Sequence, residues 1–292
     1  YKSEIIFSFI VFILLFCAVL QFKNHDDFPY YHFPYVYYLT QQSLHLGIGQ
    51  FNHGFRTPSS IFYINSLFYL PYAKFYLFNF TSLFILGFTN IILLKKIHNY
   101  FKFVFTKVEQ LNLINFLSLL SFVFINIFFY RISEYGTDRA AMILIFLFII
   151  ELLNFVNLKT VKTFNLFYIY FLGALIISFK SFYILYIIFF IPLFFYILKK
   201  NKNYSQTWYF LIINKYFVLF LFLFLFVLFT YFINTGCLVY PLSLTCLNGI
   251  NWGIPLTQVE QMKEWYELWS KGGAGPNFRI DNPEEYIKNF NW

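Results

Sequence analysis

Long runs of apolar residues, separated by short polar loops, dominate this chain of 292 residues. A helix needs about 20 mostly apolar residues to cross the hydrocarbon core of a membrane. The first run extends from Ile5 to Phe22, and the others cover residues 75–94, 111–130, 139–156, 164–179, 181–198 and 214–233. Only 12% of the residues are charged, against about 25% in soluble domains. The sequence therefore predicts an all-α polytopic membrane protein with about seven transmembrane helices.

Two segments of the first long loop, residues 23–74, are predicted to be helices that lie at the membrane surface. Residues 30–46 form the first, which Gly47 and Gly49 would end. Residues 58–72 form the second and are too short to span alone. Thr57 is its expected N-cap and Pro58 its first helical residue. Farther along, Ser178 to Ser181 is expected to be a tight turn between two spans.

Lysine residues predict the orientation of the chain. One set of loops carries ten lysines and a single acid, Glu109. These lysines, which we interpret as plain basic anchors, are Lys95, Lys96, Lys102, Lys107, Lys159, Lys162, Lys199, Lys200, Lys202 and Lys215. The positive-inside rule makes these loops cytoplasmic and places residues 23–74, 131–138, the turn at 178–181 and everything after 234 outside. This distribution accounts for the net charge of +8, and we expect no nucleic-acid partner.

The chain changes character after residue 234. We expect residues 1–234 to form a transmembrane module and residues 235–292 an extracytoplasmic extension. Cys237 and Cys246 lie nine residues apart on the predicted oxidising side, where a disulfide is a plausible pairing. Thr257 and Glu260 predict a capping box, and Asn282-Pro283 predicts a second helix start. Because the chain starts with Tyr1, we expect it to be a piece of a longer protein.

All four arginines fall in loops of the predicted outer face. They are Arg56, Arg131, Arg139 and Arg279. Arginine presents a planar fork of donors that suits phosphate or carboxylate, whereas lysine serves every predicted inner loop. The arginines are therefore candidates for anion binding. The alternative is chance placement with ordinary ion pairs to Glu134 or Asp138.

Asp26 and Asp27 stand side by side just after the first apolar run. Adjacent carboxylates at a membrane boundary are costly unless they face water, a partner or a substrate. One interpretation is a solvated loop start. The other is a catalytic pair, because this arrangement resembles the GT-C superfamily of glycosyltransferases, whose signature is an acidic pair in the first outer loop after the first span. Surface helices usually follow that pair, as predicted here for residues 30–46 and 58–72.

The resemblance implies transfer of a sugar from a polyprenyl-phosphate carrier on the extracytoplasmic face, in a bacterial inner membrane. Asp26 matches the usual base, and Asp27 would orient it or bind a divalent metal. Cations would stabilise the departing phosphate. The acceptor would be a lipid, glycan or protein. The substrate-binding candidates are His25, Tyr31, His32, His53, Arg56, Arg131, Glu134, Asp138, Arg139 and Lys180.

Four histidines, His25, His32, His45 and His53, also fall in the first outer loop. Together with the aspartates they would suit zinc or manganese, but their spacing matches no compact ligand motif. Hydrogen bonding to a substrate is the preferred interpretation, and no cofactor is assigned. The alternative functions are a transporter or flippase for a glycan or lipid, and a non-catalytic membrane subunit. Transporters usually carry charges within their spans and show inverted repeats, and neither is evident here.

Overall fold

The computed structural model is all-helical over the residues that it describes, which are 2–19, 27–104, 113–127, 132, 136–158, 160–272 and 282–290. This confirms the predicted helical class. The chain divides into two compact units. The first unit comprises residues 1–42 and 59–227, and the second comprises residues 43–58 and 228–292.

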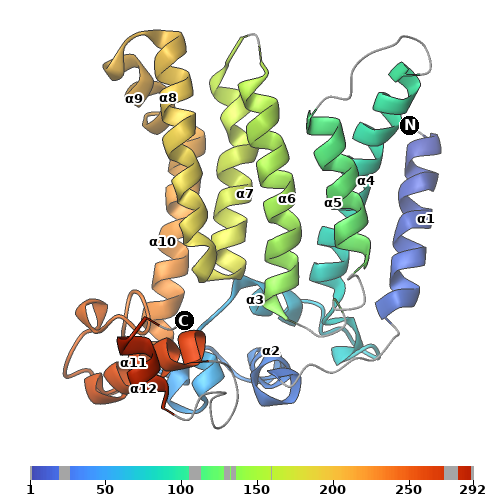
Figure 1. The fold of residues 1–292 in the computed structure, drawn as a ribbon. Coiled ribbons are helices and arrows are strands. Elements are labelled where there is room, and N and C mark those ends of the chain that lie inside the picture. Colours follow the sequence, from blue (N-terminus) through green and yellow to red (C-terminus); the bar gives the residue numbers. More distant parts are fainter. Residues whose placement is uncertain are drawn as a thin grey trace. The chain divides into compact units, whose positions relative to one another are not determined.

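The first unit is a bundle of helices that run up and down between two ends (Figure 1). Its long members are α1 (Lys2–Val19), α4 (Phe80–Val104), α5 (Leu113–Ile127), α6 (Thr137–Val156), α7 (Leu166–Phe179), α8 (Phe190–Asn201) and the first part of α10 (Lys215–Thr235), with the short α9 (Tyr204–Ile212) between the last two. A 3-10 segment, η7 (Ser181–Phe189), precedes α8. Pro192 has no N–H to donate to the Ile188 carbonyl, which weakens a continuous α-helix there.

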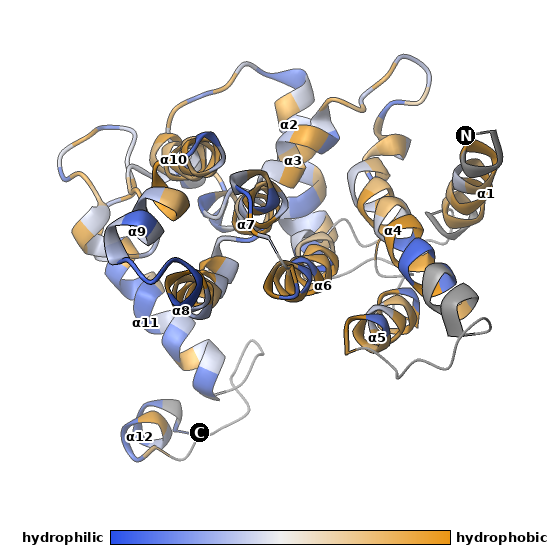
Figure 2. Ribbon diagram, turned by 90° about the horizontal axis from the view of Figure 1, so that it is seen from above, coloured by the Kyte–Doolittle hydropathy of each residue, from blue (hydrophilic) through white to orange (hydrophobic). Residues whose placement is uncertain are grey.

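Four segments are long and apolar enough to cross a membrane: Phe75–His98, Thr137–Val156, Ser181–Asn201 and Lys215–Thr235. They coincide with four of the predicted spans, and the protein is a membrane protein on this ground. The other three predicted spans coincide with shorter apolar helices, Ile5–Phe16, Leu113–Ile127 and Thr163–Phe179. Seven crossings therefore stays a prediction. Figure 2 shows apolar residues over the sides of these helices, whereas α11 in the second unit is mostly hydrophilic.

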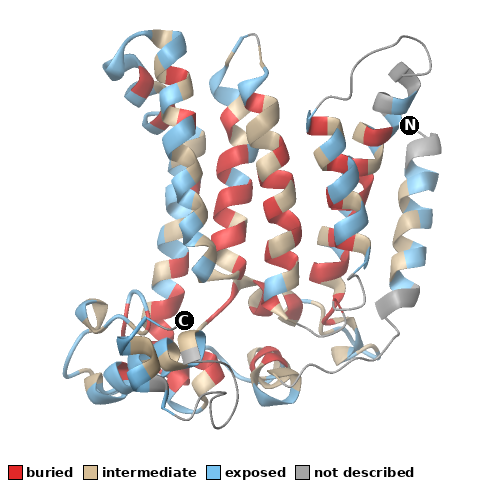
Figure 3. Ribbon diagram, in the orientation of Figure 1, coloured by how far each residue is buried: buried red, intermediate tan, exposed pale blue. Residues whose placement is uncertain are grey.

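The core of the first unit lies where α6 packs against α7 and α4 (Figure 3). Helix α1 packs against α4, with the ring of Phe12 against Gly87, where a Cβ would clash with it. Asn90 of α4 and Asn126 of α5 exchange two hydrogen bonds of 2.9 and 2.7 Å. A reciprocal amide pair leaves neither side chain unsatisfied between apolar helices, so it fixes the register of α4 against α5.

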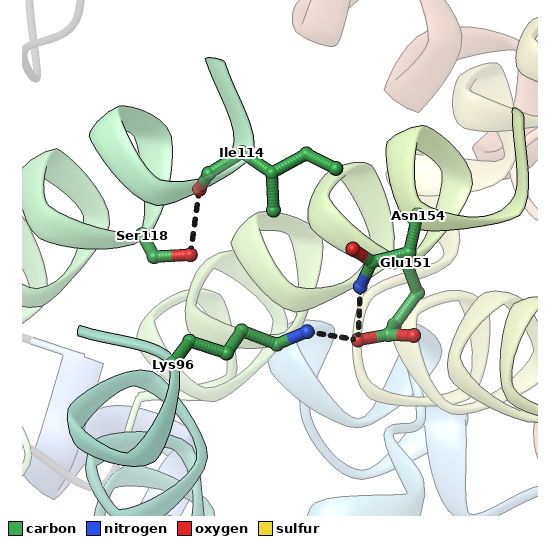
Figure 4. A network of polar contacts seen from close by, with 5 residues as sticks. All are labelled: Lys96, Ile114, Ser118, Glu151 and Asn154. Atoms are coloured by element: carbon green, nitrogen blue, oxygen red, sulfur yellow. Dashed lines mark hydrogen bonds and ion pairs between the residues drawn. The ribbon is translucent and has the colours of Figure 1, made fainter. Parts of the chain in front are cut away.

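Lysines gather at the end of the bundle where α4, α6 and α8 end, and α7 and α10 begin (Figure 1). The lysines of this end are more than plain anchors. Lys96 forms a 3.2 Å ion pair with Glu151 of α6, whose Oε1 also accepts a 3.0 Å hydrogen bond from Asn154 (Figure 4). Lys200 donates to the Leu158 carbonyl at 2.6 Å. These contacts tie neighbouring helices together at the lysine end.

The surface helices of the first long loop are shorter than predicted. A π-helical turn, η1 (Phe28–His32), leads into α2 (Phe33–Gln41), which ends five residues before the predicted boundary. The next helix, α3 (Ser60–Ser66), begins after Ser59 and not after Thr57. The Ser59 hydroxyl accepts from the Ile61 N–H at 3.3 Å, so serine is the N-cap, and the Thr57-Pro58 interpretation is wrong.

Residues 43–58 belong with the C-terminal unit, although the sequence divides the chain at residue 234 alone. Hydrogen bonds within this unit explain the grouping. The Gly47 N–H donates to the Ile233 carbonyl at 2.8 Å, and the Asn234 amide donates to the Phe55 carbonyl at 3.1 Å. Gly47 adopts a left-handed conformation with φ of 75°, in a turn five residues after α2 has ended.

The second unit also holds α11 (Leu256–Gly272) and α12 (Pro283–Lys288), which pack against each other. Helix α12 begins as predicted, since the Asn282 side chain accepts from the Glu285 N–H at 3.3 Å. Helix α11 begins at Leu256, so Thr257 lies inside its first turn and is not its N-cap. The structure joins Cys237 and Cys246 in a disulfide.

Candidate functional site

The end of the bundle opposite the lysines carries a set of polar side chains from three parts of the first unit. We call Asp27, Tyr31, His32, Asp138, Arg139 and Lys180 the polar cluster. Helix α6 begins at this end and α7 finishes there (Figure 1), and His32 of η1 approaches Gly136 at the start of α6. The contacts described next link members in pairs, and one close approach, of His32 to Gly136, relates the turn of residues 27–32 to the start of α6.

Lys180 owes its position to the end of α7. The Ser59 hydroxyl donates to the Phe179 carbonyl at 2.6 Å, and the Ser60 hydroxyl donates to the Ser178 hydroxyl at 2.9 Å. Ser59 thus caps α3 and also satisfies a carbonyl in the last turn of α7. Lys180 follows at once as the extended C-cap residue, where its ammonium lies at the negative end of the helix dipole.

Lys180 forms a 2.9 Å ion pair with Asp138 in the first turn of α6. The side chain of Lys180 is 38% exposed and that of Asp138 is 64% exposed. Arg139 follows Asp138, and the charges of both residues act on the hydroxyl of Tyr183 in η7. Lys180 and Asp138 are therefore paired where α7 ends and α6 begins, whereas Arg139 lines a small pocket with Phe124 and Ile125 of α5.

Asp27 and His32 come from the π-helical turn. The Tyr31 hydroxyl donates to Asp27 Oδ2 at 3.4 Å, a long hydrogen bond. His32 is buried, with its ring stacked edge-on against Tyr31 and its Cε1 only 3.8 Å from where a Cβ on Gly136 would lie. Because Gly136 is the N-cap of α6, this contact brings the acidic turn to the same helix end that presents Asp138.

Four sequence-predicted site residues, His25, Asp26, Arg131 and Glu134, lie outside the described residues. The expected convergence of Arg131 with Arg139 and Lys180, and the role of Asp26, therefore stay predictions. Among the described residues, no group of three histidine, cysteine, aspartate or glutamate side chains comes together to hold a metal ion.

Arg56 and His53 belong to the second unit, where protein groups surround them. Arg56 donates to the Gly49 carbonyl at 3.0 Å, the Tyr240 hydroxyl at 3.2 Å and Gln258 Oε1 at 3.2 Å. His53 Nε2 lies 2.8 Å from the sulfur of Met262 in α11. Burial and the Arg56 charge lower the pKa of His53, which favours the neutral ring. Both residues join residues 43–58 to the rest of their unit.

The second unit also contains a cavity of about 380 Å³. Among the described residues, the polar side chains that line it are all carboxamides, from Gln50, Asn248, Asn251 and Gln258, and none of these lining side chains is ionisable. Gln50 donates to the Gly253 carbonyl at 3.0 Å, which fixes one wall. Paired donors and acceptors without net charge suit a neutral ligand that bears hydroxyl groups.

The sequence did not reveal Ser59, Ser60 or Tyr183 as parts of the site. A serine before an apolar helix signals an N-cap, but nothing local says that its hydroxyl also reaches a second helix. Tyr183 stands in an apolar run rich in tyrosine and phenylalanine, and only the pairing of α6 with η7 marks it.

Residues 1–287 match the family described as a domain of unknown function, DUF8201. The chain belongs to this family. No curated protein matches the chain significantly. No solved structure matches it significantly.

Proposed function

We propose that this protein is a membrane glycosyltransferase of the GT-C type, which moves a sugar from a polyprenyl-phosphate carrier to a lipid, glycan or protein acceptor. The observation that carries the proposal is the polar cluster. It sets Asp27 and the π-helical turn near the start of α6, where Asp138 pairs with Lys180. A carboxylate and cations close together are what transfer from a lipid phosphate requires.

The chemistry divides between the two sides of the cluster. A carboxylate of the Asp26–Asp27 pair takes the proton from the acceptor hydroxyl as its oxygen attacks the anomeric carbon. The bond from that carbon to the phosphate oxygen breaks, and the phosphate leaves with the electron pair. Lys180 and Arg139 stabilise this departing charge. In the resting protein Asp138 balances Lys180, and the 2.9 Å pair is exposed enough to exchange for a phosphate.

In this proposal Asp26 is the base and Asp27 orients it. Tyr31 and His32 offer aromatic faces and hydrogen-bonding groups for a sugar ring. The lysine-rich opposite end favours an extracytoplasmic location for the cluster. The carboxamide-lined cavity of the second unit independently favours carbohydrate as the substrate class.

Transfer of radiolabelled sugar from a polyprenyl-phosphate donor, measured in membranes that contain the protein, tests the proposal. Asp26→Asn should lower the rate about 100-fold while expression and donor binding persist, the usual scale for loss of a general base. Glu151→Gln, which removes a carboxylate at the lysine end, is the matched control and should retain transfer. Full activity of Asp26→Asn would exclude this residue as the base. Movement of the intact donor across the membrane without transfer would favour a flippase.

A further inference from the structure

The loop closed by the disulfide, residues 237–246, presents an apolar surface. It contains no charged residue. Four aliphatic side chains on it are exposed: Leu238, Val239, Leu242 and Leu244. Leu244 is 93% exposed, which is unusual for a leucine in a folded segment. A surface of this kind next to a transmembrane helix calls for an apolar partner.

Many polar groups of the same loop are turned inward or paired within it. Tyr240 is buried, and its hydroxyl accepts from Arg56. The Thr245 hydroxyl lies 3.0 Å from the Val239 N–H and 2.8 Å from the Leu242 carbonyl. Further backbone N–H groups that donate locally belong to Cys237, Leu238, Leu242, Thr245 and Cys246. Pro241 has no N–H.

This internal pairing matters because lipid offers no hydrogen bonds. Irregular backbone is excluded from hydrocarbon chiefly by its unsatisfied N–H and C=O groups. The disulfide holds the two ends of the loop together, and the bond from the Leu238 N–H to the Thr245 carbonyl, at 3.0 Å, closes it a second time. A loop with many of its polar groups engaged and its leucines outward can enter the apolar side of a membrane interface at a reduced cost.

The position of the loop in the chain indicates which membrane leaflet it can reach. Helix α10 spans 21 residues, or about 32 Å at 1.5 Å per residue, which matches a hydrocarbon core of about 30 Å. Cys237 follows only two residues after α10 ends at Thr235. The loop therefore begins where α10 leaves the membrane, within reach of the acyl chains of that leaflet.

We propose that the disulfide-closed loop 237–246 inserts its leucines into the lipid leaflet at which α10 ends, and anchors the second unit to the membrane surface. The partner is the acyl-chain region of the bilayer. A second copy of the chain or a segment of the same chain is the competing occupant. This anchoring needs α10 to cross the membrane but does not depend on the proposed transferase activity.

Photo-crosslinking of the full chain in nanodiscs of phosphatidylcholine and phosphatidylglycerol tests the anchor. Benzoylphenylalanine replaces Leu244 in one variant and the exposed Asn248, two residues beyond the disulfide, in a matched control. Mass spectrometry should find acyl-chain adducts at position 244 several-fold more often than at position 248. Equal lipid labelling at the two positions, or crosslinks from 244 chiefly to protein, would overturn the proposal.

A second measurement uses no photo-crosslinker, so the test still holds if benzoylphenylalanine perturbs the loop. Hydrogen exchange of the peptide that contains residues 237–246 is compared between the unmodified protein and Leu244→Asp, both in the same nanodiscs. A buried charge is costly in hydrocarbon, so the variant should leave the leaflet and exchange faster in this peptide. Unchanged exchange would show that the leucine does not contact the acyl chains. The α11 peptide serves as the internal reference for intact folding of the second unit.

Discussion

The two ends of α6 each carry an acid that pairs with a lysine of a neighbouring helical segment, and the two pairs differ in environment. Glu151 pairs with Lys96 of α4, and the two side chains are only 26% and 25% exposed. Asp138 pairs with Lys180, and these side chains are 64% and 38% exposed. Asn154 supports the first pair, whereas the second stands at the start of α6, which His32 approaches at Gly136. The Glu151–Lys96 pair holds two helices together, whereas in the exposed Asp138–Lys180 pair a phosphate can replace the carboxylate.

The largest expected difference between the two ends concerns Lys180 and Lys96. Lys180→Ala should weaken binding of a polyprenyl-phosphate sugar about tenfold, because a charge-assisted contact to phosphate is lost. Lys96→Ala removes the same side chain type at the lysine end and should leave the affinity unchanged. Binding to the purified protein in detergent measures both. Equal losses of donor affinity in the two variants would mean that the loss reflects impaired folding. The two ends of α6 would then not differ in donor binding.

Stability should show the opposite order. Glu151→Gln leaves the partly buried Lys96 without its counter-charge, and we expect a loss of about 1 kcal/mol, at the upper end for ion pairs that are not fully buried. Asp138→Asn breaks an exposed pair, so its effect should be smaller than about 0.5 kcal/mol. The thermal midpoints of the two variants in one detergent give the comparison. A larger loss of stability for Asp138→Asn would show that the structural pair is Asp138–Lys180 and not Glu151–Lys96.

Asp138→Asn should also strengthen donor binding, by about two- to threefold, because Lys180 no longer has to exchange a carboxylate for the phosphate. The same titration as for Lys180→Ala measures this gain. Raised salt should reduce the difference in donor affinity between the variant and the unmodified protein, since screening weakens the Asp138–Lys180 pair that competes with the phosphate. A weaker donor affinity in Asp138→Asn would instead make this carboxylate a direct ligand of the sugar.

The smallest expected effect is a pH dependence of stability in the second unit. It should distinguish this unit from the bundle. Because the folded-state pKa of His53 is lowered from 6.5, the unfolded chain binds a proton that the folded unit resists. Stability of the second unit should therefore be complete above about pH 6.5 and decline as the pH falls below it. His53→Gln should flatten this decline. Hydrogen exchange of the α11 peptide between pH 5 and 8 measures the stability of the second unit, with the α6 peptide as the reference for the bundle.

Local patterns determined the elements that depend on neighbouring residues. The apolar runs predicted the helices, because burial of apolar side chains and satisfaction of backbone groups act along each segment. The turn at Lys180 and the N-cap at Asn282 were readable for the same reason. The N-cap of α3 was not. Ser59 and Thr57 are equally good caps locally, and the bond from Ser59 to the Phe179 carbonyl, 120 residues away, favours the serine.

Charge patterns in the sequence predicted one set of loops rich in lysine and an opposite set with mixed acids and bases, because such loops share a side when helices alternate direction. Only the tertiary structure decided which charges meet. Asp138 pairs with Lys180, and Arg56 joins Gly49, Tyr240 and Gln258. Asp138 and Lys180 lie 42 residues apart, and Arg56 lies 184 and 202 residues from Tyr240 and Gln258, so no local pattern specifies these pairs. The physical reason is that a side chain's partner depends on how helices pack, which the whole chain determines.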